Sequence, residues 1–488
     1  MGINDRVAIA VVGLALLSGP AHAIQPERWI PLRWPHAAPY SPETLELLRG
    51  TPINCVLVKW TQGATASDEA RRSVRAFAEH ARSLGVDVLG VVTAEDLAHG
   101  CTDRRESGLA GVVLQGAFTD APAALAEFRR SAPAGMPVVF LSPGSPRPEG
   151  IALFGSLEGA EARVRTTEGD AAVATPSSEP WIDTNLSLVR SMIAARGRPV
   201  WLGSSLEKPP AADCFRTIAD VAAEGGRWVI SPDVSFLEEL RRQKPEAVAA
   251  WRRISSYLEF FEKHSEWRGL SPAGGLGVIQ DSAVKDPEVF GETLNLLMRR
   301  RVPYRIIPRP SLGTASLDGL TAVLSTGLPA PTDAERALLA QFVERGGLLV
   351  AGSNWSKVRN SAGAYSIVPS GKGQAVVYHE ELPDPETVAR DMPSLFGRNR
   401  LAVRIFNGPS VLCPARISSD GSRMLVQLIN YASLPAEDVT VRVAGAWRTA
   451  RILSPDDAPA DAVLEQTGES VQTRIRNFKI YAALLFER

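Results

Sequence analysis

The segment PSSEPWIDTN, residues 176–185, brings acidic, aromatic and amide side chains together in a short stretch. They are Glu179, Trp181, Asp183 and Asn185. Carboxylates beside an aromatic ring are typical of carbohydrate sites, because the ring packs on a sugar face while a carboxyl protonates the glycosidic oxygen. We expect Asp183 to be catalytic, with Glu179, Trp181 and Asn185 binding the sugar. The alternative is that Asp183, or the better placed Asn185, caps a helix that begins near Leu186.

Cleavage of a glycosidic bond needs a second carboxylate, about 5–5.5 Å from the first in retaining enzymes and about 6.5–9.5 Å in inverting ones. Asp233 in ISPDVSF and Glu207 in GSSLEKPP are further catalytic candidates, and Glu158 is a candidate for substrate binding. Asp96 and Asp120 also follow predicted strands. The alternatives are that Asp233 caps the next helix, and that Glu207 and Glu158 are solvated surface acids.

Other chemistries find little support in the sequence. Trp60 ends the predicted strand NCVLVKW, where either a sugar platform or a core position fits. The six histidines show no HExxH or paired spacing, so we expect no metal site. The segment GGLG at 274–277 precedes a strand, so it predicts no phosphate loop, and the GxSxG form of a nucleophilic serine is missing from the candidate turns. We therefore expect no cofactor.

These residues would be positioned by a parallel sheet. Residues 41–270 alternate short apolar segments with segments of helical periodicity, as parallel strands buried on both faces do. Their number and spacing predict a (β/α)8 barrel over residues 24–272, with an open doubly wound sheet as the alternative. The active site of such a barrel lies at the carboxyl ends of the strands. The predicted strands are 54–60, 86–92, 109–116, 137–143, 151–157, 170–176, 198–204 and 227–233.

Two further units follow the barrel. Residues 273–385 alternate strands and helices again, which predicts a small doubly wound α/β domain. Residues 386–488 contain strands without helices, separated by Gly, Asp, Pro and Ser turns. The clean alternation of Val439, Val441 and Val443 predicts a half-solvated antiparallel sheet, so we expect a C-terminal β-sandwich.

The N-terminus has the form of an export signal. Arg6 precedes the apolar segment 7–17, and AHA at 21–23 is a small-x-small cleavage site. We expect a secreted or periplasmic protein whose mature chain begins near Ile24, the alternative being an apolar tail on a cytosolic protein. The rest of the chain has no apolar run of about 18 residues, so we expect no membrane span.

The net charge and the cysteine content limit the kinds of partner, metal site and disulfide that we expect. The net charge is −1 with interspersed signs, so we expect neither nucleic acid nor an anionic membrane as partner. The four cysteines are widely spaced, without metal-type motifs. Export would permit a disulfide, with Cys55–Cys101 the first pair to consider, but small buried thiols are the favoured interpretation.

The order of the three units resembles glycoside hydrolases of the β-galactosidase type. These have a catalytic barrel, an amidotransferase-like domain often used for oligomerisation, and a C-terminal β domain. Residues 317–353 are similar to the amidotransferase-like pattern, and LVQLINYAS and ARILSPD are similar to the appended sandwich. The resemblance implies hydrolysis of a glycosidic bond by a carboxylate pair, a carbohydrate substrate or ligand, and a possible homo-oligomer formed through the second domain.

The sequence departs from the pattern of these glycoside hydrolases in two ways, so alternative functions have to be considered. Residues 275–380 contain no cysteine, and His379 and Glu380 are adjacent, so amidotransferase chemistry is not expected. The barrel region also lacks the Asn-Glu pair that barrel glycosidases commonly carry. The alternatives are a non-catalytic carbohydrate-binding protein on a degenerate glycosidase barrel, and a structural oligomer.

Overall fold

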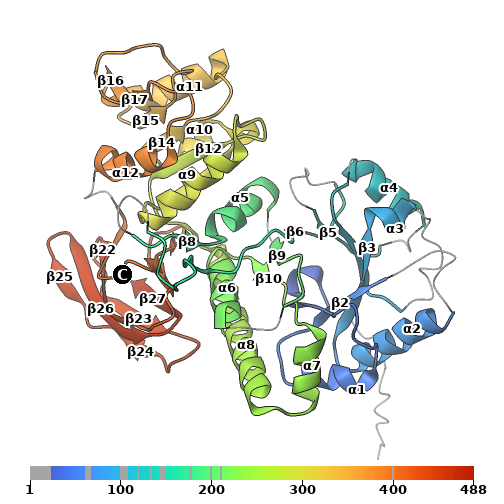
Figure 1. The fold of residues 1–488 in the computed structure, drawn as a ribbon. Coiled ribbons are helices and arrows are strands. Elements are labelled where there is room, and N and C mark those ends of the chain that lie inside the picture. The colour runs from blue at the N-terminus through green and yellow to red at the C-terminus, as the bar shows by residue number, and fades with distance from the viewer. Residues whose placement is uncertain are drawn as a thin grey trace, which may run out of the picture.

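A barrel lies beside two smaller units, an α/β unit and a β-sandwich (Figure 1). The predicted export signal at 1–23 lies outside the described residues. Within the part of the chain that is described, no helix combines the length and the apolar character needed to cross a membrane. The computed structural model describes residues 24–60, 68–98, 108–118, 120–131, 135–142, 149–174, 179–197, 200–208, 212–397 and 401–488.

The barrel strands run parallel in the order β1-β2-β3-β4-β5-β6-β9-β10, which confirms the predicted eight-stranded barrel. The ring closes where β1 meets the residues after β10. There the Arg33 N–H donates to the Ile230 carbonyl (2.7 Å) and the Ile230 N–H donates to the Pro31 carbonyl (3.3 Å). The strands are β1 (Pro31–Arg33), β2 (Cys55–Lys59), β3 (Asp87–Thr93), β4 (Gly111–Gln115), β5 (Val138–Leu141), β6 (Leu153–Ser156), β9 (Val200–Leu202) and β10 (Arg227–Trp228).

Alternate strand residues fill the barrel interior, because successive side chains of a strand point to opposite faces. A Cβ on Gly155 would lie 2.4 Å from the carbonyl oxygen of Trp201 and 3.0 Å from its Cβ, so glycine permits the close approach of β9 to β6. The other strand faces are covered by helices, and burial on both faces explains the near-continuous apolar strands. We call the inner residues the interior cluster; they are Trp29, Cys55, Leu57, Leu89, Val91, Val113, Val139, Leu141, Leu153, Trp201 and Val229.

Helices follow most of the barrel strands. The last of them, α8, buries Trp251, Ile254, Leu258 and Phe261 at helical spacing, the pattern of an amphipathic helix packed on a core. The barrel helices are α1 (Pro42–Leu45), α2 (Asp68–Ser83), α3 (Ala94–Ala98), α4 (Ala121–Ser131), α5 (Leu186–Arg196), α6 (Ala212–Ala223), α7 (Val234–Arg241) and α8 (Pro245–Lys263).

One predicted barrel strand, 170–176, is wrong. Its described residues belong to an excursion, residues 157–185, that leaves the barrel after β6 and returns at α5. The excursion pairs with itself, with β7 (Arg163–Val164) antiparallel to β8 (Ile182–Asp183). Asp170, Ala171, Ala172 and Ala174 are exposed there, so the described residues of the predicted strand belong to a surface segment. The eighth barrel strand is β1, which the sequence did not predict.

The second unit is a mixed sheet in the order β13-β12-β14-β15-β17-β16, in which only the β16–β17 pair is antiparallel. Helices α9 and α12 cover one face and α10 and α11 the other, which confirms the doubly wound arrangement. The strands are β12 (Leu276–Gln280), β13 (Tyr304–Pro308), β14 (Ala322–Ser325), β15 (Leu348–Ala351), β16 (Tyr365–Ser370) and β17 (Gly373–Tyr378). The helices are α9 (Pro287–Arg299), α10 (Thr314–Leu317), α11 (Asp333–Glu344) and α12 (Pro385–Phe396).

The third unit packs two antiparallel sheets, as predicted. Val439, Val441 and Val443 are fully buried between the sheets, and they account for the alternation in the sequence. One sheet contains β11 (Ser271–Pro272), β19 (Val411–Leu412), β20 (Ala415–Ile417), β21 (Arg423–Asn430), β23 (Thr449–Leu453), β24 (Ala460–Asp461) and β27 (Tyr481–Glu487). The other contains β18 (Val403–Phe406), β22 (Ala436–Ala444), β25 (Glu465–Thr467) and β26 (Ser470–Phe478).

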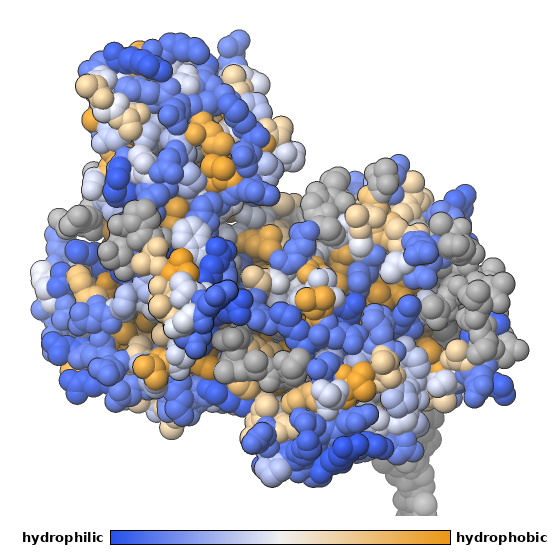
Figure 2. All heavy atoms as spheres, in the orientation of Figure 1, coloured by the Kyte–Doolittle hydropathy of each residue, from blue (hydrophilic) through white to orange (hydrophobic). Residues whose placement is uncertain are grey.

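Two cysteines are buried as free thiols, and the face drawn in Figure 2 is mainly hydrophilic. Cys55 is a free thiol in the interior cluster, and burial raises its pKa well above the ordinary value. Cys413 is also buried and free, whereas Cys101 lies outside the described residues. Figure 2 shows one face on which hydrophilic residues predominate and apolar residues form small, separate groups.

Candidate functional site

Asp183 lies in β8 of the excursion and does not follow a barrel strand. The Arg165 guanidinium donates to its Oδ1 from Nε and Nη2, each at 2.7 Å. The Trp181 ring contacts the guanidinium groups of Arg165 and Arg299, whose Cζ atoms lie 5.2 and 5.3 Å from the ring centre. Arg299 also donates to the carbonyl of Glu179 (3.4 Å). Residues 179–181 therefore pack against α9, and the described residues of the predicted strand 170–176, after which Asp183 was expected to face the barrel mouth, are not in the barrel sheet.

Asn185 is buried beside Asp220 of α6. Its Nδ2 donates to the Ala160 carbonyl (2.9 Å) and to Asp220 Oδ2 (2.8 Å), and its Oδ1 accepts from the Ala160 N–H (2.9 Å). Asp220 also accepts hydrogen bonds from the hydroxyls of Thr184 and Tyr431. Burial raises the pKa of Asp220, and these hydrogen bonds oppose the shift. Asn185 occupies the N-cap position of α5, as the alternative predicted, but its side chain makes no capping hydrogen bond; the buried amide is not an open ligand contact.

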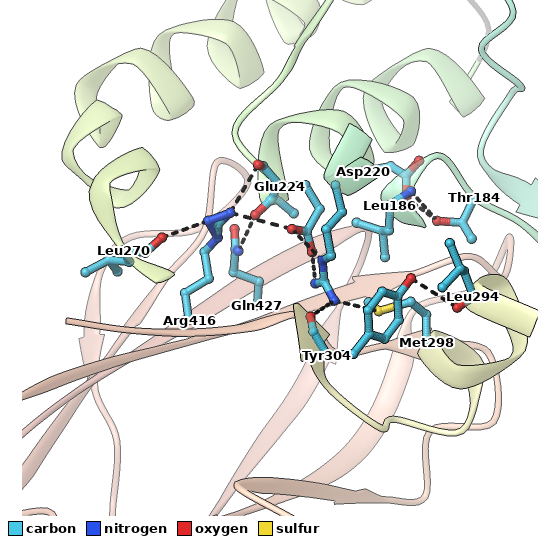
Figure 3. Close-up of polar contacts among 12 residues, drawn as sticks. Thr184, Leu186, Asp220, Glu224, Leu270, Leu294, Met298, Tyr304, Arg416 and Gln427 are labelled. Carbon is cyan, nitrogen blue, oxygen red and sulfur yellow. Dashed lines mark hydrogen bonds and ion pairs between the residues drawn. The ribbon is translucent and has the colours of Figure 1, made fainter. Parts of the chain in front are cut away.

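A second buried network, which we call the junction, joins all three units (Figure 3). Arg190 of α5 donates to Glu224 Oε2 (3.2 Å) and to the carbonyl of Tyr304 in the α/β unit (2.7 Å). On the other side of Glu224 lies Arg416 of the sandwich, whose Nη2 is 3.5 Å from Oε2. Gln427 of β21 donates to the Ala223 carbonyl at the end of α6 (2.8 Å). Because these contacts are buried and link residues of all three units, we assign the junction a structural role.

Three of the other predicted acids make local contacts at helix starts. Asp233 caps α7 and Asp120 bonds at the start of α4, each accepting from the backbone N–H three residues further on, at 2.8 and 3.0 Å. Asp96 of α3 accepts from the backbone N–H and the hydroxyl of Thr93, at 3.0 and 2.8 Å. The alternative given for Asp233, a helix cap, is what the contacts show.

Trp60 occupies a core position. It is 6% exposed and packs outside the barrel sheet, where a Cβ on Gly90 would lie 2.9 Å from the indole ring and 2.8 Å from Leu109. Glycine at position 90 therefore makes the space for the indole. Trp60 is closed off from the barrel mouth, which excludes the platform role in this conformation.

Polar side chains from adjacent strands line the barrel mouth, meaning the carboxyl ends of the strands. Lys59, Thr93 and Gln115 each follow an interior-cluster residue of the same strand by two positions, so they share its inward face. Arg33 ends β1, is 7% exposed, and donates through Nη1 to the carbonyls of Ser204 (3.5 Å) and Ser205 (3.1 Å). The site predicted from the sequence, made of acids, tryptophans and Asn185, included none of these four residues.

Of the acids predicted from the sequence, Glu207 lies beside these polar residues of the barrel mouth. Its Oε1 accepts from the His36 backbone N–H (2.9 Å) in the chain that follows β1. Burial lowers the pKa of Arg33 and Glu207 opposes that shift, so the two charges lie within electrostatic range. Burial, then Arg33 and Lys59, lower the pKa of the His36 imidazole, whereas Glu207 acts to raise it. Arg33, His36, Lys59 and Glu207 therefore form one charged cluster at the mouth.

Glu158 approaches the same edge from the next strand of the sheet. It follows β6, and its backbone forms an antiparallel bridge with Ser204, in the loop that carries Glu207. Its side chain is exposed, with Ser156 Oγ 3.4 Å from Oε2. Two carboxylates thus lie on neighbouring loops at the carboxyl ends of β6 and β9, where barrel chemistry takes place.

We also considered the cavity in the sandwich and possible metal-binding groups as alternative sites. A cavity of about 520 Å³ opens between the sheets of the sandwich, lined by residues such as Ile452, Asp461 and Phe478, far from any barrel strand end. Among the described residues, no group of three or more His, Cys, Asp or Glu side chains is arranged to hold a metal ion.

No family model and no curated protein sequence matches the chain. Its structure is similar to α-L-fucosidase isoenzyme 2 from Paenibacillus thiaminolyticus, with a TM-score of 0.59 and 12% identity over 94% of this chain and 99% of that chain. It is also similar to a β-galactosidase from Rahnella sp. R3, with a TM-score of 0.54 and 10% identity over 92% and 95% of the two chains. The chain therefore shares the fold of these barrel glycoside hydrolases along nearly its whole length, as the resemblance in its sequence implied.

Proposed function

We propose that the protein is a glycoside hydrolase whose active site is the barrel mouth, with Glu207 and Glu158 as its carboxylates. The observation that carries the proposal is their placement on adjacent loops after β6 and β9, beside Arg33 and Lys59. Of the other acids the sequence suggested, Asp96, Asp120 and Asp233 contact helix starts and Asp183 is ion-paired. The shared fold agrees with this function but does not establish it.

The contacts suggest different roles for the two acids. The His36 N–H fixes one oxygen of Glu207, and a fixed carboxylate suits a nucleophile or a base that must be aligned with the sugar. Glu158 projects into solvent from the neighbouring loop, where it would protonate the departing oxygen. Arg33, Lys59, Thr93 and Gln115 would bind the sugar hydroxyls.

The test is hydrolysis of a panel of aryl glycosides and oligosaccharides by the mature chain. Glu207→Gln and Glu158→Gln should each lower kcat/KM by about 100-fold or more, the range of general acid–base catalysis. Azide should rescue Glu207→Ala with an activated aryl glycoside, because a small anion can occupy the space left by the carboxylate. Turnover unaffected by either substitution would refute the assignment, and no turnover by the unmodified chain would refute the function.

A second candidate is carbohydrate binding without hydrolysis. The described inward positions at the ends of β1–β4 carry Arg33, Lys59, Thr93 and Gln115, and none of these four is a carboxylate. A sugar could bind there without acid catalysis. Saturable binding measured by calorimetry, weakened by Lys59→Ala and accompanied by no turnover, would favour this candidate. Homo-oligomerisation through the α/β unit, and export, stay predictions.

A further inference from the structure

The amino ends of the strands, which we call the base of the barrel, are closed by the first described residues of the chain. Asp87, the first residue of β3, accepts a hydrogen bond from Trp29 Nε1 (2.8 Å) and one from the backbone N–H of Ile24 (3.2 Å). Trp29 belongs to the interior cluster, and the Ile24 side chain packs against that cluster. The backbone nitrogen of Ile24 is thus held at the base by both packing and a carboxylate.

Asp87 is a buried carboxylate with little charge compensation. It is 8% exposed, and burial raises its pKa, opposed by the bonds from Trp29 and Ile24 and by the charge of Arg82. Arg82 itself donates to the Gly108 carbonyl (2.6 Å). Among the described residues, the Asp87 carboxylate accepts these two hydrogen bonds and forms no ion pair.

The remaining charged neighbours are already engaged. Arg227, at the start of β10, donates to Glu262 from Nε and Nη2 (2.9 Å each) and to the Glu27 carbonyl (2.5 Å). The charges of Asp87 and Arg227 act in opposite directions on the pKa of the Cys55 thiol. Burial raises this pKa further, so the thiol stays protonated. The base therefore has a place for one more positive charge, next to Asp87.

We propose that export processing supplies this charge: cleavage of the Ala23–Ile24 bond makes Ile24 the first residue, and its new α-ammonium forms a buried ion pair with Asp87. Hydrolysis adds one water, leaving a carboxylate on Ala23 and an amine on Ile24 that takes up a proton. The AHA motif at 21–23 places the cut at this bond, and the 3.2 Å contact places the resulting nitrogen beside the carboxylate.

Cleavage changes the contact from a neutral to a charged one. The amide of Ile24 offers a single donor, whereas an ammonium offers three donors and a full charge, and hydrogen bonds between ionised partners are about twice as strong as neutral ones. The inference follows from the base of the barrel and is independent of the glycosidase proposal. It predicts that the processed chain is more stable than any chain that retains residues before Ile24.

The ion pair has a pH signature. The α-amino group ordinarily has a pKa of about 7.7–8.0, and Asp87 beside it raises the pKa in the folded chain. A raised folded pKa gives stability that is complete below the unfolded value and is lost as the pH rises through the folded value. Arg82, Arg227, Glu262 and Cys55 are the other titratable groups packed around this point.

The experiment compares a chain that begins at Ile24 with one that begins at Ala23, each with Asp87 and with Asp87→Asn. At pH 7 the Ile24 chain should melt at a higher temperature than the Ala23 chain, and the difference should vanish in the Asp87→Asn pair and above pH 10. Equal melting temperatures with Asp87 present, or a difference that persists in Asp87→Asn, would overturn the ion pair.

Two further measurements keep the test decisive if Asp87→Asn does not fold. The pH dependence of acetylation of the α-amine in the Ile24 chain should report a pKa above the ordinary range; an ordinary value would overturn the proposal. The full chain exported from a bacterial host should have the intact mass of residues 24–488. A mass that corresponds to another N-terminus would also overturn it.

Discussion

At the scale of single residues, Glu262 shows how partners decide the state of a carboxylate. Burial acts to raise its pKa, but hydrogen bonds from Arg227 and Arg268 outweigh burial and set the pKa at about 2. An unperturbed glutamate has a pKa of about 4.3, so the folded value is depressed. The stabilisation is therefore complete above about pH 5 and is lost as the pH falls through 2.

Glu262→Gln should lower the free energy of unfolding at pH 7 by roughly 3 kcal/mol, which corresponds to this pKa difference. It should also flatten the pH dependence of stability between about pH 5 and 2, measured by urea denaturation. Glu238→Gln is the matched control, because Glu238 faces Arg242 in an exposed pair at 3.5 Å that contributes less than about 1 kcal/mol. Equal effects of the two substitutions at pH 7 would contradict the account.

The residue types in the candidate site were only partly predictable. Glu158 and Glu207 follow strands whose apolar sequences are evident, so their place at the mouth could be predicted. Asp183 and Trp181 had the right chemistry, but their position depended on a strand that is not in the barrel. Arg33 was overlooked because its three-residue strand contains a proline and a buried arginine, which do not form an apolar run.

At the scale of elements, substitution of Asp233 distinguishes a helix-capping role from a catalytic role. Asp233→Ala should destabilise the fold by about 1 kcal/mol, because α7 loses the acceptor of the Phe236 N–H. Glycoside hydrolysis at 25 °C should be unchanged. Thermal unfolding and kcat/KM measure the two effects, with Ser235→Ala as the neighbouring control. Loss of turnover with unchanged stability would make Asp233 a catalytic residue instead.

The elements were predictable where burial leaves a clear signature. Strands β2 to β6 read as apolar runs because helices cover one face and the interior cluster the other. Residues 170–174 have a similar pattern but lie in an exposed excursion, and nothing in the local sequence distinguishes the two cases. The pairing of β1 with residue 230 depends on the closure of the ring, which is a property of the whole sheet.

At the scale of the molecule, the junction makes the three units depend on one another. Glu224 is 1% exposed and lies between Arg190 and Arg416, so it connects the end of α6 to α5 and to β20 of the sandwich. Glu224→Ala should cost about 3–5 kcal/mol, the usual effect of removing one partner of a buried ion pair. Calorimetry should show a lower and broader transition, whereas Arg242→Ala, in an exposed pair, should leave it unchanged. A sharp transition at the original temperature would show that the units are stabilised separately.

The central claim is that the active site lies at the barrel mouth and not at the PSSEPWIDTN segment. The measurement that tests it most directly is kcat/KM of Glu207→Gln beside Asp183→Asn, on a glycoside that the unmodified chain hydrolyses. We predict a loss of about 100-fold or more for Glu207→Gln and a change of less than about threefold for Asp183→Asn, whose carboxylate is ion-paired with Arg165. A large loss in Asp183→Asn with full turnover in Glu207→Gln would contradict the account and move the active site to the excursion.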